Sequence, residues 1–174
     1  MKKIKKIAYT SLFTALICAS AFICIPTAPP FTMQTFAIFL SLLILGASKA
    51  FCAILIYVCI GLLGLPVFSA VQGGIGTLLN PGGGFIIGFL LMPAAFAVTL
   101  NLFKLKPFYS CIASLLPLYT AGVIWFIFIS GAGFSINTVS TAILTYVIPF
   151  IIPDILKLTL ALFVQKRIKG WIKL

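Results

Sequence analysis

Long apolar segments that contain almost no charged residues dominate this sequence. Of the 174 residues, 63% are apolar and only 7% are charged, whereas about a quarter of the residues of a soluble domain are charged. A helix rises about 1.5 Å per residue, so about 20 apolar residues cross a hydrocarbon core of about 30 Å. We therefore predict one all-α integral membrane domain over residues 1–174, with six transmembrane helices at about 7–25, 31–48, 51–65, 85–103, 108–129 and 153–165.

The apolar stretch 138–164 is too long for one simple span, and it contains Pro149 and Pro153, which interrupt helical hydrogen bonding. We expect an outer re-entrant or interfacial segment at about 138–150, a break from Pro149 to Pro153, and a final helix that begins at Pro153.

At the N-terminus, a cleaved signal peptide is the competing interpretation, but no small-x-small cleavage site precedes a polar segment. We expect the first apolar run to be a membrane span.

The basic residues predict how the bundle is oriented. Eleven of the twelve basic residues flank the apolar segments: Lys2, Lys3, Lys5, Lys6, Lys49, Lys104, Lys106, Lys166, Arg167, Lys169 and Lys173. They precede the first segment, separate the second from the third and the fourth from the fifth, and follow the last, while the other connections contain none. By the positive-inside rule, both termini are expected in the cytoplasm, with the chain in the cytoplasmic membrane.

Most enzyme classes are excluded by residues that the sequence lacks. With no histidine and a single acidic residue, a Ser-His-Asp triad, a paired-carboxylate site and a histidine-based metal site cannot form. No Walker motif is present, so any use of ATP would belong to partner subunits. Nucleic-acid binding is disfavoured because the basic residues lie between apolar runs. We predict that the chain is not an enzyme and holds no cofactor or metal. The five cysteines form no CxxC pair and are interpreted as buried apolar side chains.

Asp154 and Lys157 are the charged residues expected inside the membrane. Lys166 follows Asp154 by twelve residues, about 18 Å of helix, which places Asp154 well away from the cytoplasmic surface. A lone charge near mid-bilayer costs roughly 2.5–3.5 kcal/mol on insertion scales, and residues three apart share a helix face. One interpretation is a structural pair, with Asp154 also favoured by the positive end of a helix that starts at Pro153. The interpretation we favour is that both residues line a substrate cavity.

Two connections carry clusters of uncharged polar residues. The connection at 71–85 is rich in glycine and contains Asn80, whose amide both donates and accepts hydrogen bonds. Its glycines either allow the backbone to approach a ligand closely or make a flexible link. The cluster at 32–35 includes Gln34 and lies at an expected helix start. Both connections are expected on the outer side of the membrane.

Two helical patterns have a packing interpretation as well as a functional one. Tyr119, Gly122 and Trp125 follow one another at a spacing of three in the fifth apolar segment, and such aromatic stripes often reflect packing alone. Small residues recur every fourth position in the first segment, at Ser11, Ala15 and Ala19. This spacing lets another helix approach closely in lipid.

Several local motifs occur together in one order, at 30–36, 45–46, 57–61, 64–68, 73–74, 80–85, 88–89, 119–125 and 149–157. In this combination the sequence resembles the BioY family, the biotin-specific substrate-binding subunit (S component) of energy-coupling factor (ECF) transporters, over about residues 8–165. Two motifs depart from the family pattern. In the glycine-rich loop, usually Gly-Pro-Thr-Gly-Gly-Tyr, the first, third and last positions hold Asn80, Gly82 and Phe85. Before the last helix, Ile152-Pro153-Asp154 replaces Pro-Gly-Asp.

The resemblance implies a six-helix S-component bundle that binds one biotin near the outer face, under the loops between helices. It also implies partners that drive uptake, namely a transmembrane coupling protein and two ATPase subunits. In this family an Ala-x-x-x-Ala pattern docks the coupling protein, and it matches Ala15 and Ala19. We therefore expect high-affinity biotin binding and uptake. The alternative is a solitary transporter of biotin or another vitamin that works without ATPases.

Biotin offers two ureido N–H donors, a ureido oxygen, an apolar bicycle and an anionic tail, and each suggests a partner. We expect Asp154 and Asn80 to bind the ureido group, because a carboxylate that accepts N–H bonds in a low dielectric binds strongly. Lys157 would balance the charge of Asp154 and donate to the ureido oxygen. Four more residues complete the predicted site, three as aromatic cover for the rings and the last as a peripheral polar contact: Phe85, Tyr119, Trp125 and Gln34.

Overall fold

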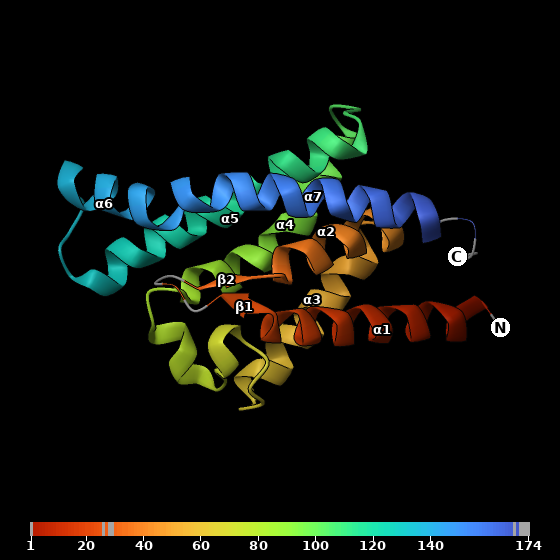
Figure 1. Cartoon of the computed structure of the whole chain (residues 1–174), viewed down its shortest axis with the longest axis horizontal. Coiled ribbons are helices and arrows are strands. Elements are labelled where there is room, and N and C mark those ends of the chain that lie inside the picture. The colour runs from red at the N-terminus through yellow and green to blue at the C-terminus, as the bar shows by residue number, and fades with distance from the viewer. Residues whose placement is uncertain (1, 26, 28–29, 169, 171–174) are drawn as a thin grey trace.

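The computed structural model describes residues 2–25, 27, 30–168 and 170. Within this part of the chain, long helices and one short hairpin form an elongated bundle (Figure 1). The helices are α1 (Lys2–Phe22), α2 (Gln34–Leu45), α3 (Ala47–Leu62), α4 (Gly83–Asn101), α5 (Pro107–Ser130), α6 (Ile136–Tyr146) and α7 (Ile148–Ile168). Between them lie the strands β1 (Cys24–Ile25) and β2 (Phe31–Thr32) and the short 3-10 helices η1 (Ser69–Val71) and η2 (Ile75–Leu79).

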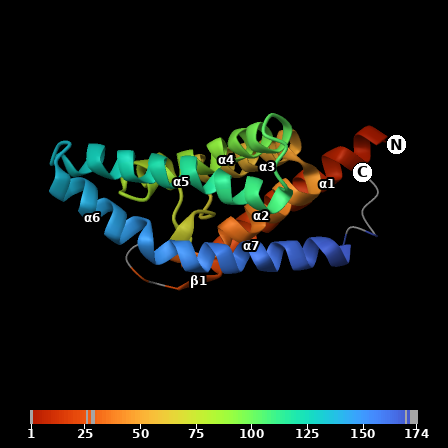
Figure 2. The same ribbon diagram turned by 90° about the horizontal axis from the view of Figure 1, so that it is seen from above.

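Three of the described helical segments are long and apolar enough to cross a membrane: α4, α5 and the continuous segment Ile136–Ile168, which contains α6 and α7. The apolar helices α2 and α3 are shorter, at 12 and 16 residues. The start of α1 and the end of α7 lie at one end of the bundle, and the turn from α5 to α6 lies at the other (Figures 1 and 2). Over its described residues, the molecule is an all-helical membrane protein apart from the hairpin of β1 and β2.

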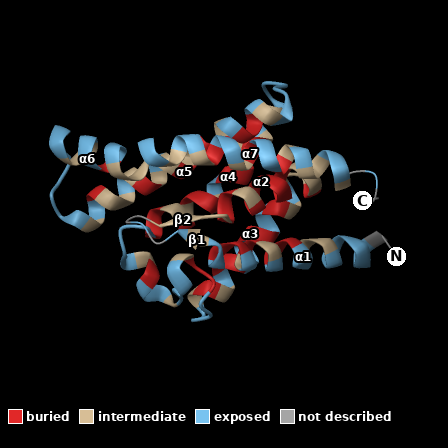
Figure 3. Cartoon of the chain, viewed as in Figure 1, coloured by how far each residue is buried: buried red, intermediate tan, exposed pale blue. Residues whose placement is uncertain are grey.

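Helix α2 lies at the centre of the bundle. It packs against α1, α3 and α7, and Figure 2 shows α7 on one side of it with α4 and α5 on the other. Most of its side chains are buried (Figure 3). A helix that is apolar all round is stable when protein surrounds it, so α2 need not match the bilayer in length.

Backbone breaks explain why α2 is shorter than the apolar segment at 31–48. The first residues of the apolar segment, Phe31 and Thr32, form strand β2 and pair with β1. At the other end Gly46 has a φ of +77°, a left-handed conformation that glycine adopts at little cost. The helix therefore begins at Gln34 and ends at Leu45, and α3 starts directly after Gly46.

The last apolar stretch breaks earlier than the sequence predicts. The break lies at Val147, where φ is −116° and ψ is −60°, and α7 runs through both Pro149 and Pro153. Pro149 is the second residue of α7, where its missing N–H has no helical partner to lose. Pro153 removes one helical hydrogen bond, which transmembrane helices tolerate. Asp154 is thus the seventh residue of its helix. The alternative interpretation, in which the positive end of a helix that starts at Pro153 favours Asp154, is therefore wrong in that respect.

Candidate functional site

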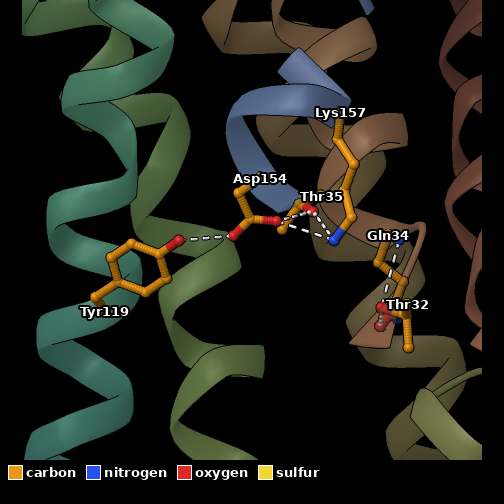
Figure 4. Close-up of polar contacts among 6 residues, drawn as sticks. All are labelled: Thr32, Gln34, Thr35, Tyr119, Asp154 and Lys157. Atoms are coloured by element: carbon orange, nitrogen blue, oxygen red, sulfur yellow. Dashed lines mark hydrogen bonds and ion pairs between the residues drawn. The ribbon is translucent and has the colours of Figure 1, made fainter. Parts of the chain in front are cut away.

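The carboxylate of Asp154 is buried where α7 meets α2 and α5. Only 1% of the residue is exposed. Its Oδ1 accepts hydrogen bonds from Thr35 Oγ1 at 2.8 Å and from Lys157 Nζ at 2.9 Å, and its Oδ2 accepts one from the Tyr119 hydroxyl at 2.8 Å (Figure 4). Donors from three helices therefore fix this carboxylate in place.

Lys157 lies one turn after Asp154 on the same face of α7. Its ammonium group forms an ion pair with Asp154 Oδ1 at 2.9 Å and also donates to Thr35 Oγ1 at 3.0 Å. The Lys157 side chain keeps 11% of its surface exposed and the Asp154 side chain 2%. Removing either partner of a buried ion pair leaves an uncompensated charge, which costs about 3–5 kcal/mol. The predicted pairing of these two residues is present.

A second group of hydrogen-bonded polar residues is centred on Gln34, the residue before Thr35. Thr32 Oγ1 donates to Gln34 Oε1 at 2.9 Å, and Gln34 Nε2 donates to the Tyr57 hydroxyl. Gln34 and Tyr57 are both buried. Each end of the Gln34 amide bonds to a protein group, so this side chain links β2 to α3.

These polar groups open onto one cavity inside the bundle. Polar lining comes from Thr32, Gln34, Thr35, Tyr119, Asp154 and Lys157, and apolar lining from Phe85, Ile86, Phe89, Leu118 and Phe150. The connections between helices also contribute to the wall, through Pro30, Ser69 and Gly82. Small-molecule sites typically combine mostly apolar walls with a few well-placed polar groups, and this cavity has that character.

Aromatic rings from several elements stack along the cavity wall. Phe150, at the start of α7, stacks on Phe31 of β2 with ring centroids 4.3 Å apart, and lies 6.4 Å from Phe85 of α4. Phe85 also stacks with Tyr146 at 6.1 Å. Offset stacking at such distances is favourable. The rings therefore join β2, α4, α6 and α7 beside the cavity.

Glycines let α4 and α5 approach closely enough to place Phe85. A Cβ on Gly122 would collide with the Phe85 ring, and a Cβ on Gly84 would collide with Trp125 Cβ and Ala121 O. Of the three residues Tyr119, Gly122 and Trp125, packing therefore explains Gly122. Tyr119 turns toward Asp154, and Gly122 makes room for the aromatic ring from α4.

The structure brings five of the seven predicted ligand contacts together and leaves two outside. Gln34, Phe85, Tyr119, Asp154 and Lys157 all line the cavity. Asn80 is exposed, and its Nδ2 lies 3.5 Å from Gln72 Oε1. Trp125 Nε1 donates to Leu78 O at 2.8 Å, which ties α5 to η2. Neither Asn80 nor Trp125 is part of the cavity wall.

Three residues in this polar network were not selected as ligand contacts from the sequence: Thr32, Thr35 and Tyr57. Thr32 and Thr35 lay within the polar cluster at 32–35, and the position of this cluster at an expected helix start was the available signal. Tyr57 stands inside an apolar segment, and nothing in the sequence around it indicates its bond with Gln34. Ala15 and Ala19 are exposed on α1 and lie apart from the cavity.

The fold and the site define a class of protein: an all-helical membrane protein that encloses a small-molecule cavity around a buried ion pair. The family model described as the BioY family matches residues 1–173. The chain belongs to the BioY family. The predicted family resemblance is thereby confirmed.

Two relatives match almost from end to end. A probable biotin transporter BioY from Pyrococcus horikoshii is 36% identical over 97% of this chain and 98% of its own length. The biotin transporter BioY from Thermotoga maritima is 35% identical over 95% of this chain and 96% of its own length. Both relatives are named as transporters, in agreement with the prediction that this chain is not an enzyme.

A solved structure shows the same fold. It is the S component for biotin from an ECF-type ABC transporter, with a TM-score of 0.78, 24% sequence identity, and coverage of 97% of this chain and 93% of the other. The predicted S-component architecture is therefore confirmed at the level of the fold.

Proposed function

We propose that this chain captures biotin in the cavity and takes it up across the cytoplasmic membrane as the S component of an ECF-type transporter. Membership of the BioY family, relatives named as biotin transporters and the S-component fold support this proposal. The observation that carries it is the buried pair of Asp154 and Lys157 on the cavity wall.

The ion pair of Asp154 and Lys157 keeps hydrogen-bonding groups that a ligand can use. A carboxylate oxygen has two lone pairs and an ammonium group has three N–H donors. Asp154 Oδ1 already accepts two bonds and Oδ2 one, while Lys157 already donates two. One acceptor site on Oδ2 and one N–H of Lys157 remain. An acceptor beside a donor matches an N–H group next to a carbonyl, which is one edge of the ureido group of biotin.

The apolar lining suits the rest of the ligand. Phe85 and Phe150 present aromatic surface, and Ile86, Phe89 and Leu118 add aliphatic and aromatic surface. Burying the bicycle of biotin against them gains about 25 cal/mol for each Å² of apolar surface removed from water. We propose that these walls hold the ring system while the ion pair fixes the orientation of the ureido group.

Asn80 is proposed as a second ureido contact, conditional on movement of the connection that carries it. The residue lies outside the cavity wall, but Gly82, two positions later, lines the cavity. An inward shift of this connection would carry the Asn80 amide toward the ligand. Trp125, which holds η2 through Leu78, would support this connection and not cover the ligand directly.

The orientation and partners of the chain are also part of the proposal. We place the start of α1 and the end of α7, which lie at the same end of the bundle (Figure 1), on the cytoplasmic side because the basic residues gather there. The coupling protein would dock on α1 at Ala15 and Ala19, whose exposed small side chains permit close helix approach. Two ATPase subunits would then supply the energy, and this chain would need no cofactor.

Titration calorimetry of the detergent-solubilised full chain with biotin tests the binding proposal. We expect tight binding of one biotin per chain, with thiamine and riboflavin giving no heat. Binding of either of those vitamins in place of biotin would refute the proposed substrate.

Uptake tests the proposed partnership. Cells that express this chain together with an energy-coupling module should accumulate labelled biotin, and cells that lack the module should not. Equal uptake in both would favour a solitary transporter.

A further inference from the structure

Thr35 differs from other helical threonines in the group to which its hydroxyl donates. Six threonines donate to a backbone carbonyl three or four residues earlier in their own helix: Thr10, Thr14, Thr99, Thr120, Thr141 and Thr159. Thr35 is the second residue of α2, and the residue four positions earlier is Phe31 in strand β2. Because no helical carbonyl precedes it there, its hydroxyl is available for another partner.

That partner is the ion pair of the cavity. Thr35 Oγ1 donates to Asp154 Oδ1 at 2.8 Å and accepts from Lys157 Nζ at 3.0 Å (Figure 4). A single hydroxyl from α2 therefore bonds to both charged groups of α7. The contact is buried, since 8% of Thr35 and 1% of Asp154 are exposed.

This bridge determines which atoms of the pair remain free. With Thr35 in place, Oδ1 of Asp154 is filled by two donors, and the open lone pair is on Oδ2. Two N–H groups of Lys157 are also engaged, so the remaining one has a defined direction. Hydrogen bonds are stronger in the low dielectric of a protein interior, so these buried contacts hold the pair in one arrangement while one acceptor site and one N–H stay open.

We propose that Thr35 is a positioning residue, which selects the carboxylate oxygen and the ammonium hydrogen that face the ligand and so sets the selectivity for an N–H group beside a carbonyl. The inference rests on the proposed function of the cavity. Thr35 acts through Asp154 and Lys157 and need not touch the ligand.

The substitution Thr35→Val isolates this role because it keeps the shape of the side chain and removes the hydroxyl. Oδ1 then regains a lone pair, Lys157 loses an acceptor, and the carboxylate can turn so that either oxygen faces the cavity. Biotin should bind about tenfold more weakly, because the ligand must then order a carboxylate and an ammonium group that Thr35 holds in place in the wild-type protein. The protein should also discriminate less between biotin and its two derivatives methylated on one or the other ureido nitrogen.

The experiment measures the affinities of these three ligands for the full chain in detergent. Thr35→Ser keeps the hydroxyl and should retain both affinity and discrimination. Thr14→Val is the matched control, because Thr14 is a buried threonine whose hydroxyl bonds to backbone carbonyls of α1 and α3, and it should leave both unchanged. If Thr35→Val gives no monodisperse protein, Thr35→Ala provides the same comparison with Thr35→Ser.

The outcomes separate this inference from the proposed function. Wild-type protein that fails to bind biotin would overturn both. Wild-type binding together with unchanged affinity and discrimination in Thr35→Val would overturn the positioning role alone. So would a Thr35→Ser variant as weak as Thr35→Val, or a loss of affinity with the discrimination ratio intact, because packing would then be the cause.

Discussion

The substitution Asp154→Asn changes the charge of the cavity while almost preserving the shape of the side chain. The carboxylate accepts three hydrogen bonds, from Thr35 and Lys157 on Oδ1 and from Tyr119 on Oδ2. An asparagine oxygen can still accept the first two. Its NH₂ group cannot accept the third and cannot accept an N–H from the ligand either.

Two separate costs follow from this geometry. Lys157 is left as a buried charge without a counterion, and breaking such a pair costs about 3–5 kcal/mol of folding stability. Ligand binding loses a hydrogen bond to a charged group, about 1.5–3 kcal/mol, which corresponds to a roughly 10- to 150-fold weaker affinity. The double variant Asp154→Asn with Lys157→Met removes the unpaired charge, so it should recover much of the stability but not the affinity.

Thermal unfolding and biotin titration of the same detergent-solubilised samples measure both costs. We expect Asp154→Asn to unfold at a lower temperature and bind biotin weakly, and the double variant to unfold later but still bind weakly. Wild-type affinity in Asp154→Asn would refute the role of the carboxylate in binding. A double variant no more stable than the single one would refute the argument from the unpaired charge.

Three further predictions follow from individual contacts. Tyr119→Phe removes the donor to Asp154 Oδ2 but keeps the ring. Calorimetry should show biotin affinity about tenfold lower, because the ligand must then fix the orientation of the carboxylate itself; unchanged affinity would mean that this hydroxyl does not orient the carboxylate. Asn80→Ala should weaken binding by less than Asp154→Asn, because Asn80 is exposed outside the cavity wall; an equal or larger loss would show that the loop closes fully over the ligand. Ala15→Trp places a bulky group on the exposed face of α1 and should leave affinity in detergent unchanged while abolishing uptake that depends on the coupling module; normal uptake would argue against docking there.

The sequence predicted features that depend on local pattern. Apolar runs and their interruptions predicted an all-helical membrane protein, and the three-residue spacing predicted the contact of Asp154 with Lys157. Both features follow from helical geometry, which acts over a few residues. The family resemblance added candidate residues, and most of these line the cavity.

Features that depend on contacts between distant segments were missed. Thr35 lies 119 residues from Asp154 along the chain. Its hydroxyl can bond to the ion pair because the hairpin of β1 and β2 sets where α2 begins, so no helical carbonyl precedes Thr35 to accept it. One local feature was also missed: the final break lies at Val147, because Pro149 at the second position of α7 costs no helical hydrogen bond and the one lost at Pro153 is tolerated. The outward position of Asn80 depends on how the whole connection between α3 and α4 folds.

Mass spectrometry of the small molecule that copurifies with the full chain tests the central claim most directly. Protein solubilised in detergent from cells grown with biotin, thiamine and riboflavin should carry biotin at one molecule per chain. The Asp154→Asn variant, purified in parallel, should carry markedly less. Thiamine or riboflavin on the wild-type protein, with no biotin, would contradict the claim that this cavity binds biotin.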